Sequence, residues 1–359
     1  MDYSGRLDRL RARLRQERAD TFVVSHLPNI RYLTGFTGSN ALLVVTPARV
    51  VFYSDSRYRQ QAAEEVVGAR VVIPPKGQLL AAAAKALARS RRVALEAAHL
   101  SWADLLRWHA LAGKSRRYLA AHGWVERLRA VKEPAEIAAI RAALDLAAAV
   151  LPPVLESVRP GMTERELAAR LEFALRQAGG AGTAFDTIVA SGPRAAIVHG
   201  RAADKPLRAG ELVIVDYGVW RGDYCSDMTR TFAVGRAPRK ARQIHRAVLE
   251  AQQAAIAACG PGAACRRVDA AARKVLAAHG LGEYFVHSTG HGLGLEVHEA
   301  PRLAAASADR LEAGHVVTIE PGVYLPGWGG ARIEDVVAIT PRGAEVLSSS
   351  PRELLEVGS

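Results

Sequence analysis

Four acidic residues in the second half of the chain form two pairs, and each pair flanks a turn between apolar segments. The acids are Asp216 after Leu212–Val215, Asp227 on the return towards Val234, Glu320 after His315–Ile319, and Glu334 in the return Arg332–Thr340. A single acid at the end of a strand would be an ordinary exposed residue. Four acids placed symmetrically beside apolar runs need a common positive partner, because an uncompensated buried charge is costly. The pattern therefore predicts a metal site.

Hairpin geometry brings the acids of each pair together. A first turn centred on Arg221-Gly222 would place Asp216 opposite Asp227, with β-carbons about 5 Å apart. A second, longer turn rich in Gly and Pro and centred on Gly327 would place Glu320 opposite Glu334. Two hairpins then supply four converging carboxylates.

The donor set indicates which ions would bind. Carboxylates and imidazoles favour Mn²⁺, Co²⁺, Fe²⁺ or Zn²⁺ over ions that prefer thiolates. Four negative charges balance two divalent cations, which activate water as a nucleophile. We therefore expect two divalent metal ions and hydrolytic chemistry.

Three histidines lie in a glycine-rich segment between the two acidic pairs. They are His287, His291 and His298, and the Val-His pair that ends at His298 has a counterpart ending at His199. A lone histidine is more often structural than a ligand, but the glycines here permit close backbone approach. His291 is the best candidate for a fifth ligand, and His298 and His199 are candidates for proton transfer or anion stabilisation.

The elements that must position these residues form an internal repeat. Pro160-Gly161 and Pro261-Gly262 each precede a helix that ends in glycine, at Gly179 and Gly280, so both landmarks recur after 101 residues. Each of these helices follows a longer Ala-rich helix, at about 135–157 and 240–258. The repeat predicts an α+β catalytic domain with pseudo-twofold symmetry, over residues 127–359.

The first part of the chain alternates differently. Strand-like runs at 21–25, 41–46, 50–53, 71–73 and 92–95 are interspersed with helical stretches at 5–19, 56–65, 79–89 and 102–112. This order predicts a separate α/β domain, which we place at residues 1–126.

Composition limits the remaining possibilities. The three cysteines are too few and scattered for a disulfide framework, and no apolar run approaches the roughly 20 residues that span a membrane. We expect a cytoplasmic protein without membrane contact. The net charge of +12 admits a nucleic-acid or basic binding module as an alternative, but the basic residues are spread along helices rather than massed.

The motifs together resemble the pita-bread metallopeptidases, in particular the prolidase and aminopeptidase P group. The resemblance is carried by Gly290–Pro301, Glu320-Pro321-Gly322, Arg332-Ile333-Glu334-Asp335 and the Asp216…Asp227 pair. Pro28–Phe36, Asp55-Ser56-Arg57-Tyr58 and Leu128–Lys132 resemble the creatinase-like N-terminal domain of that group. All five ligand positions are filled, unlike those of metal-free relatives. Val198 departs from the family, which often has proline there.

The resemblance implies a role for each site residue. Asp216 would hold one metal ion, Asp227 and Glu334 would bridge both, and His291 and Glu320 would hold the other, with Mn²⁺ as the favoured ion. Glu320 would be the general base, His199 and His298 would assist the tetrahedral intermediate and the leaving nitrogen, and His287 would line the proline pocket. Arg332 and Tyr324 would order the groups around the metal ions, and Arg302 would bind a substrate carboxylate.

The implied substrates are peptides with proline in the second position. A dipeptidase is favoured over an aminopeptidase acting on longer peptides, and the resemblance also suggests a homodimer.

Overall fold

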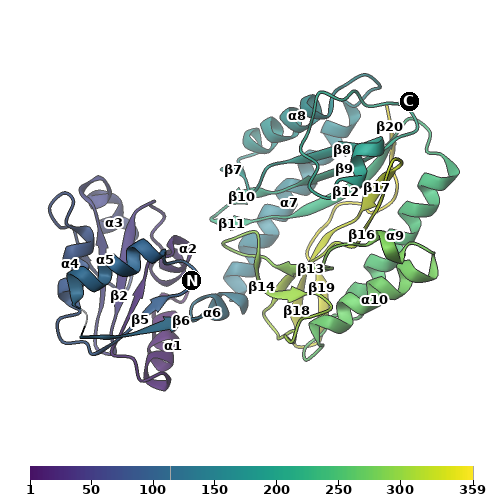
Figure 1. Cartoon of the computed structure of the whole chain (residues 1–359). Coiled ribbons are helices and arrows are strands. Elements are labelled where there is room, and N and C mark those ends of the chain that lie inside the picture. Colours follow the sequence, from purple (N-terminus) through teal and green to yellow (C-terminus); the bar gives the residue numbers. More distant parts are fainter. Residues whose placement is uncertain (114, 359) are drawn as a thin grey trace. The chain divides into compact units, whose positions relative to one another are not determined.

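The computed structural model describes residues 1–113 and 115–358, and the chain forms two compact units, Met1–Arg129 and Ala130–Ser359. Each unit has its own sheets and its own apolar core (Figure 1).

The first unit is built on a mixed sheet of strand order β4-β3-β2-β1-β5-β6. The strands are β1 (Thr21–Val24), β2 (Ala41–Val45), β3 (Val50–Ser54), β4 (Arg70–Val72), β5 (Arg92–Glu96) and β6 (Arg117–Ala121). The helices are α1 (Tyr3–Gln16), α2 (Leu27–Thr34), α3 (Arg59–Glu65), α4 (Leu79–Ala86), α5 (Trp102–Ala112) and α6 (Glu126–Ala130), which reaches the unit boundary. The predicted α/β class is thus confirmed, although α2 and β6 were not expected.

The helix α2 carries sequence signals that identify it. Pro28 lies in its first turn, where the missing N–H costs nothing, and Gly35 ends it with a φ of 84° in the left-handed region. Alternating residues of β1 then face opposite sides of the sheet. Val23 packs with Ala83 of α4 and Trp108 of α5, whereas the ring of Phe22 lies 5.0 Å from that of Trp124.

The second unit is a duplicated arrangement of two helices and a sheet. Its first half contains α7 (Pro134–Glu156), α8 (Glu164–Gln177) and the sheet β20-β12-β9-β8; its second half contains α9 (Arg239–Ala257), α10 (Cys265–Ala278) and the sheet β14-β13-β15-β18-β19. The predicted repeat and the capping box of Thr163 and Glu166 at the start of α8 are both present. Figure 1 shows α7 and α8 against the teal strands and α9 and α10 against the green and yellow ones.

The strands of the second unit carry or flank the predicted ligand residues. They are β8 (Ile188–Ser191), β9 (Leu212–Tyr217), β12 (Met228–Val234) and β20 (Glu356–Val357) in the first half, and β13 (Gly290–Gly292), β14 (Glu299–Leu303), β15 (Val316–Ile319), β18 (Asp335–Thr340) and β19 (Gly343–Val346) in the second. Shorter pieces are β7 (Gly182–Thr183), β10 (Val219–Arg221), β11 (Tyr224–Cys225), β16 (Gly322–Leu325) and β17 (Gly329–Arg332).

One expectation about apolar length was wrong. The helix α7 is long and apolar enough to cross a membrane by length and composition alone. Its residues Ala143, Ala147 and Leu151, however, are buried against α8 and the first-half sheet. Burial against protein is the behaviour of a core helix, and one such helix is weak grounds for a membrane span.

The three cysteines are buried thiols, as predicted. Cys225 lies on β11, and Cys259 and Cys265 lie at the junction of α9 and α10. Burial raises the pKa of Cys259 to about 12 and that of Cys265 to about 11.

Candidate metal centre

The first acidic hairpin has a register that differs from the expected one. Asp216 on β9 lies opposite Thr229 of β12, not opposite Asp227. The cause is the turn, which is formed by Gly222 and Asp223 with φ of 56° and 70°. Two consecutive residues of positive φ define the tight hairpin turn that suits strand twist, and Asp tolerates this conformation. Asp227 is therefore the diagonal neighbour of Asp216, and both acids line the same cavity.

The second hairpin has the predicted register. Ile319 lies opposite Asp335 and Gly322 lies opposite Arg332, and Gly327 at the tip has a φ of 74°. Glu320 and Glu334 fall between these two stretches of strand pairing. The acids thus occupy an interruption in the hairpin, where their side chains turn into the cavity.

His291 is positioned by two glycines. It is the middle residue of β13, which lies between β14 and β15. A β-carbon on Gly290 would lie 1.9 Å from the carbonyl oxygen of Thr318, and one on Gly292 would lie 2.1 Å from that of Ala300. Only glycine permits this approach, so the Gly-His-Gly sequence is what brings the imidazole to the acids.

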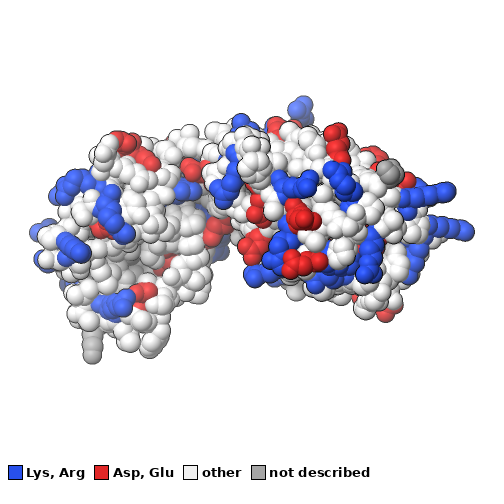
Figure 2. Space-filling view, turned by 90° about the horizontal axis from the view of Figure 1, so that it is seen from above, with Lys and Arg blue, Asp and Glu red and all other residues white. Residues whose placement is uncertain are grey.

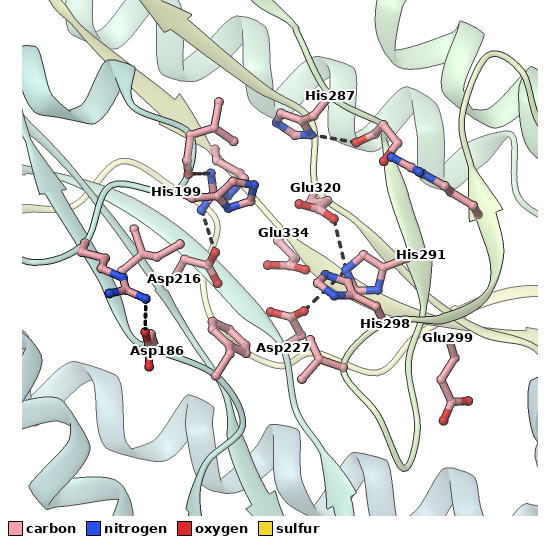
Figure 3. A pocket seen from close by; sticks show the side chains of 18 residues that line it. Asp186, His199, Asp216, Asp227, His287, His291, His298, Glu299, Glu320 and Glu334 are labelled. Atoms are coloured by element: carbon pink, nitrogen blue, oxygen red, sulfur yellow. Dashed lines mark hydrogen bonds and ion pairs between the residues drawn. The ribbon is translucent and has the colours of Figure 1, made fainter. Parts of the chain in front are cut away.

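The five predicted ligands converge on one cavity of about 700 Å³ (Figure 3). Ligand atoms of Asp227, His291 and Glu334 all lie within 4.8 Å of one another. The Nε2 atom of His291 is 3.3 Å from Glu320 Oε1 and 3.7 Å from Asp227 Oδ2. The Nδ1 atom of His291 lies 3.0 Å from the carbonyl oxygen of Gly292, to which it donates, so the lone pair of Nε2 faces the carboxylates.

Arg332 organises the opposite side of the cluster. Its Nη2 donates to Asp216 Oδ2 at 2.6 Å, its Nη1 donates to the Tyr324 hydroxyl at 2.7 Å, and its Nε donates to Thr229 Oγ1 at 3.1 Å. The Tyr324 hydroxyl in turn lies 2.8 Å from Nε2 of His287. A donor chain from Arg332 through Tyr324 thus fixes His287 at the cavity wall.

The electrostatics of the cluster are those of buried, mutually repelling acids. Burial, followed by the charges of neighbouring carboxylates, raises the pKa of Asp227 and of Glu334 well above the usual range. Burial raises the pKa of Glu320 to about 8. Burial also lowers the pKa of His291 to about 4, so the ring is neutral at pH 7 and available as a ligand.

The donor set fits divalent metal ions. Asp216 Oδ1 is buried and has no hydrogen-bond partner among the described residues, and Nε2 of the neutral His291 ring faces Asp227 and Glu320. Oxygen and imidazole donors suit Mn²⁺, Fe²⁺, Co²⁺ or Zn²⁺. A cation would give Asp216 Oδ1 a partner and relieve the repulsion that raises the other pKa values.

The remaining predicted site residues also line the cavity, except Tyr324, which acts through its contacts with Arg332 and His287. His199 comes from the segment after β8, and His298 lies just before β14 with its ring 4.3 Å from that of His291. Burial lowers the pKa of His298 below its usual value. Arg302 lies on β14 opposite His291 and lines the cavity.

Two threonines were not identified from the sequence. Thr229 Oγ1 donates to Glu334 Oε2 at 2.8 Å, and Thr318 Oγ1 lies 3.3 Å from Glu320 Oε1 and accepts from the N–H of His291 at 3.1 Å. Each is two residues from a predicted ligand, Asp227 or Glu320, and residues two apart in an extended chain face the same side. That spacing was the available signal.

Buried carboxylates, an imidazole ligand and cavity-lining histidines on a duplicated α+β unit define a metal-dependent hydrolase. Comparison with known proteins makes the class specific: residues 138–341 match the model of metallopeptidase family M24, and residues 6–131 match the creatinase/prolidase N-terminal domain. The chain belongs to metallopeptidase family M24.

Individual relatives support the same assignment. An Xaa-Pro dipeptidase of Pyrococcus furiosus is 44% identical over 64% of this chain and 66% of its own length. The structure of an Xaa-Pro dipeptidase from Bacillus anthracis is 37% identical, covers 99% of this chain and 100% of its own, and superposes with a TM-score of 0.96. That of an X-Pro aminopeptidase from Thermotoga maritima MSB8 is 34% identical, covers 96% and 100%, and has a TM-score of 0.88. The expected fold, a creatinase-like domain followed by a pita-bread domain, is confirmed.

Proposed function

We propose that this metallopeptidase hydrolyses the bond between any residue and a following proline, and that it favours dipeptides ending in proline. The observation that carries the hydrolytic centre is the convergence of Asp227, His291, Glu320 and Glu334 beside Asp216 in one cavity. The substrate is supported by the relatives, which are named for Xaa-Pro peptides. The Xaa-Pro bond is a tertiary amide without an N–H, so a centre that acts on the carbonyl group suits it.

The chain's own residues divide the reaction between them. Asp216 would hold one metal ion, Asp227 and Glu334 both ions, and His291 and Glu320 the other. The metal ions, when bound, supply positive charge that polarises the scissile carbonyl group and lowers the pKa of water. A carboxylate oxygen of Glu320 accepts the proton of the attacking water, because this side chain is partly exposed in the cavity. His199 and His298 donate hydrogen bonds to the developing oxyanion and assist the return of that proton from Glu320 to the proline nitrogen as it leaves.

The preference for dipeptides rests on Arg302. A guanidinium group binds both oxygens of a carboxylate at once, and a dipeptide presents its free carboxylate directly after proline. Arg302 extends from β14 into the same cavity as His298. An aminopeptidase acting on longer peptides is the second candidate, favoured by the similarity to the Thermotoga enzyme.

An assay separates these activities. Protein freed of metal by chelation and then reloaded with Mn²⁺ should cleave Ala-Pro faster than Ala-Pro-Gly and should leave Ala-Gly intact. Preference for Ala-Pro-Gly would establish the aminopeptidase, and no metal-dependent cleavage of either proline peptide would overturn the proposal.

Further features extend the proposal. The family resemblance supports Mn²⁺ as the native ion and a homodimer, and the composition and the order of elements support a cytoplasmic location and functional domains at residues 1–126 and 127–359. Light scattering and metal analysis of protein purified from its source would test the dimer and the ion. Nucleic-acid binding is the less favoured alternative, because the basic residues are spread along the sequence rather than massed in one run, and on the one face drawn in Figure 2 Lys and Arg lie among Asp and Glu.

A further inference from the structure

Each half of the second unit contains one fully buried carboxylate on its second helix, outside the metal cluster. Glu164 is the first residue of α8 and Asp269 lies in the second turn of α10, and both side chains are inaccessible to solvent. Burying a carboxylate is costly unless several donors satisfy it. The hydrogen-bond donors that contact these two carboxylates belong to chain segments that also carry residues of the candidate metal centre.

Glu164 closes the segment that carries His199. Its Oε1 accepts from the N–H and the hydroxyl of Ser191, both at 2.8 Å, and its Oε2 accepts from Nε of Arg194 at 3.0 Å and from the N–H of Ala203 at 3.2 Å. Ser191 and Arg194 lie before His199 and Ala203 lies after it. One side chain therefore holds both ends of the segment that places His199 in the cavity.

Asp269 makes the corresponding contacts in the second half. Its Oδ1 accepts from the N–H of Thr289 at 3.1 Å and from the Thr289 hydroxyl at 2.9 Å, and its Oδ2 accepts from Nε of Arg273 at 2.7 Å. The Thr289 carbonyl oxygen accepts the N–H of Glu320 at 2.8 Å, and His291 follows two residues later. Arg273 also donates to the carbonyl oxygen of His287.

The two carboxylates use the same kinds of donor but act on different parts of the site. Each accepts a backbone N–H and a hydroxyl from one Ser or Thr, together with an arginine N–H. However, Asp269 sits one helical turn later than the position in α10 that corresponds to Glu164. Its contacts lead to the metal ligands His291 and Glu320, whereas those of Glu164 lead to His199.

We propose that Asp269 and Glu164 are positioning residues with separate tasks: Asp269 sets the geometry of the metal ligands His291 and Glu320, and Glu164 sets the placement of His199 against the substrate. The first task concerns metal binding alone. The second rests on the proposed peptidase function.

The test uses Asp269→Asn and Glu164→Gln in the full chain, with metal affinity measured by titration calorimetry with Mn²⁺ and turnover measured on Ala-Pro. An amide nitrogen in place of either oxygen faces a donor, so each substitution breaks one side of its contacts. Asp269→Asn should weaken Mn²⁺ binding roughly 10–100-fold, the usual cost of removing a group that orients a metal ligand. Glu164→Gln should keep Mn²⁺ affinity within about twofold and lower kcat, since His199 acts on the bound substrate, by about tenfold or more.

Equal Mn²⁺ affinity in the wild type and Asp269→Asn, or an equal loss of affinity in both variants, would overturn the proposal. The Mn²⁺ measurement needs no substrate, so it stands even if the wild type cleaves no proline peptide, in which case the proposed function fails and not the role of Asp269.

Milder variants keep the proposal testable if a buried amide prevents folding. Thr289→Val replaces only the hydroxyl group and should reproduce the loss of Mn²⁺ affinity, whereas Thr289→Ser keeps the hydroxyl group and should retain the affinity. Ser191→Ala and Ser191→Thr are the corresponding pair for kcat. Glu166→Gln is the control, because Glu166 is exposed and caps the same helix α8 through Thr163. Helix destabilisation alone would give Glu166→Gln the same loss as Glu164→Gln and would contradict a positioning role.

Discussion

The two halves of the metallopeptidase unit deliver their acids by different local structures. In the first half, Asp216 is part of a continuous strand pairing between β9 and β12. In the second half, Glu320 and Glu334 lie where the pairing between β15 and β18 gives way to that between β16 and β17. Asp227 lies in a similar break, between β11 and β12, so the halves differ in the placement of Asp216. The repeat has therefore kept the convergence of charge rather than the backbone around it.

The halves also differ in what they add to the acids. The second half contributes His291, which faces Asp227 and Glu320, and Arg332, which pairs with Asp216. The two ends of the cluster thus differ, since a guanidinium group pairs with the acid at the Asp216 end and an imidazole faces the acids at the other end. Substitutions in the two halves should therefore have separable effects.

The largest effect is expected at the two acids that are proposed to hold both metal ions, one of which comes from each half. Asp227→Asn and its second-half counterpart Glu334→Gln should each lower kcat/KM more than about 10³-fold, because a metal ligand is lost. At pH 8 the metal-free variants should be more stable than the metal-free wild type, since burial and like charges raise the pKa values of both acids and the amides carry no charge to repel. Metal analysis and thermal unfolding measure the two outcomes; full activity with two bound ions would disprove the site.

The next effect separates two neighbouring histidines of the second half. His298→Ala should retain metal and lose turnover by about 10²–10⁴-fold, the range for proton transfer and oxyanion stabilisation. His291→Ala should lose metal. If metal content shows the reverse, the two roles must be exchanged.

A smaller and selective effect is expected at Arg302. Arg302→Ala should lower kcat/KM on Ala-Pro, with a loss of transition-state stabilisation of about 1.5–3 kcal/mol, the scale of a charge-assisted hydrogen bond. The value of kcat/KM on Ala-Pro-Gly should be nearly unchanged. Arg342, an exposed arginine beyond β18, is a matched control for loss of one positive charge. An equal effect on both peptides would show that Arg302 does not bind the proline carboxylate.

The smallest effect concerns the acid stability of the second half. Burial lowers the pKa of His245 on α9 to about 4, and its Nε2 has no hydrogen-bond partner among the described residues. Between pH 6.5 and 4 the His245 ring is protonated in the unfolded chain but not in the folded chain, so the free energy of unfolding falls as the pH falls. His245→Leu should remove this dependence. The substitution should therefore change the free energy of unfolding more favourably at pH 5.5 than at pH 8, by about 1 kcal/mol. Chemical denaturation at both pH values measures it; the same difference at both would exclude a titration.

The sequence predicted most of what simple periodicity and turn chemistry encode. The second hairpin register, the repeat, and the meeting of all five ligands followed from apolar runs and glycines. The first register did not, because Asp223 adopts a positive φ and moves the turn by one residue. The buried contacts of Glu164 and Asp269 were not foreseen either, since their partners other than Arg273 lie 20 to 39 residues away in the sequence.

The buried thiols lie in both halves of the second unit and can report separately on the opening of each half. A cysteine reacts with an alkylating reagent as the exposed thiolate, and burial denies both exposure and ionisation to Cys259 and Cys265. Their modification therefore records the opening of α9 and α10, whereas modification of Cys225 records the opening of the first hairpin. Mass spectrometry after short pulses of reagent would time the two events separately within one molecule, without any engineered label.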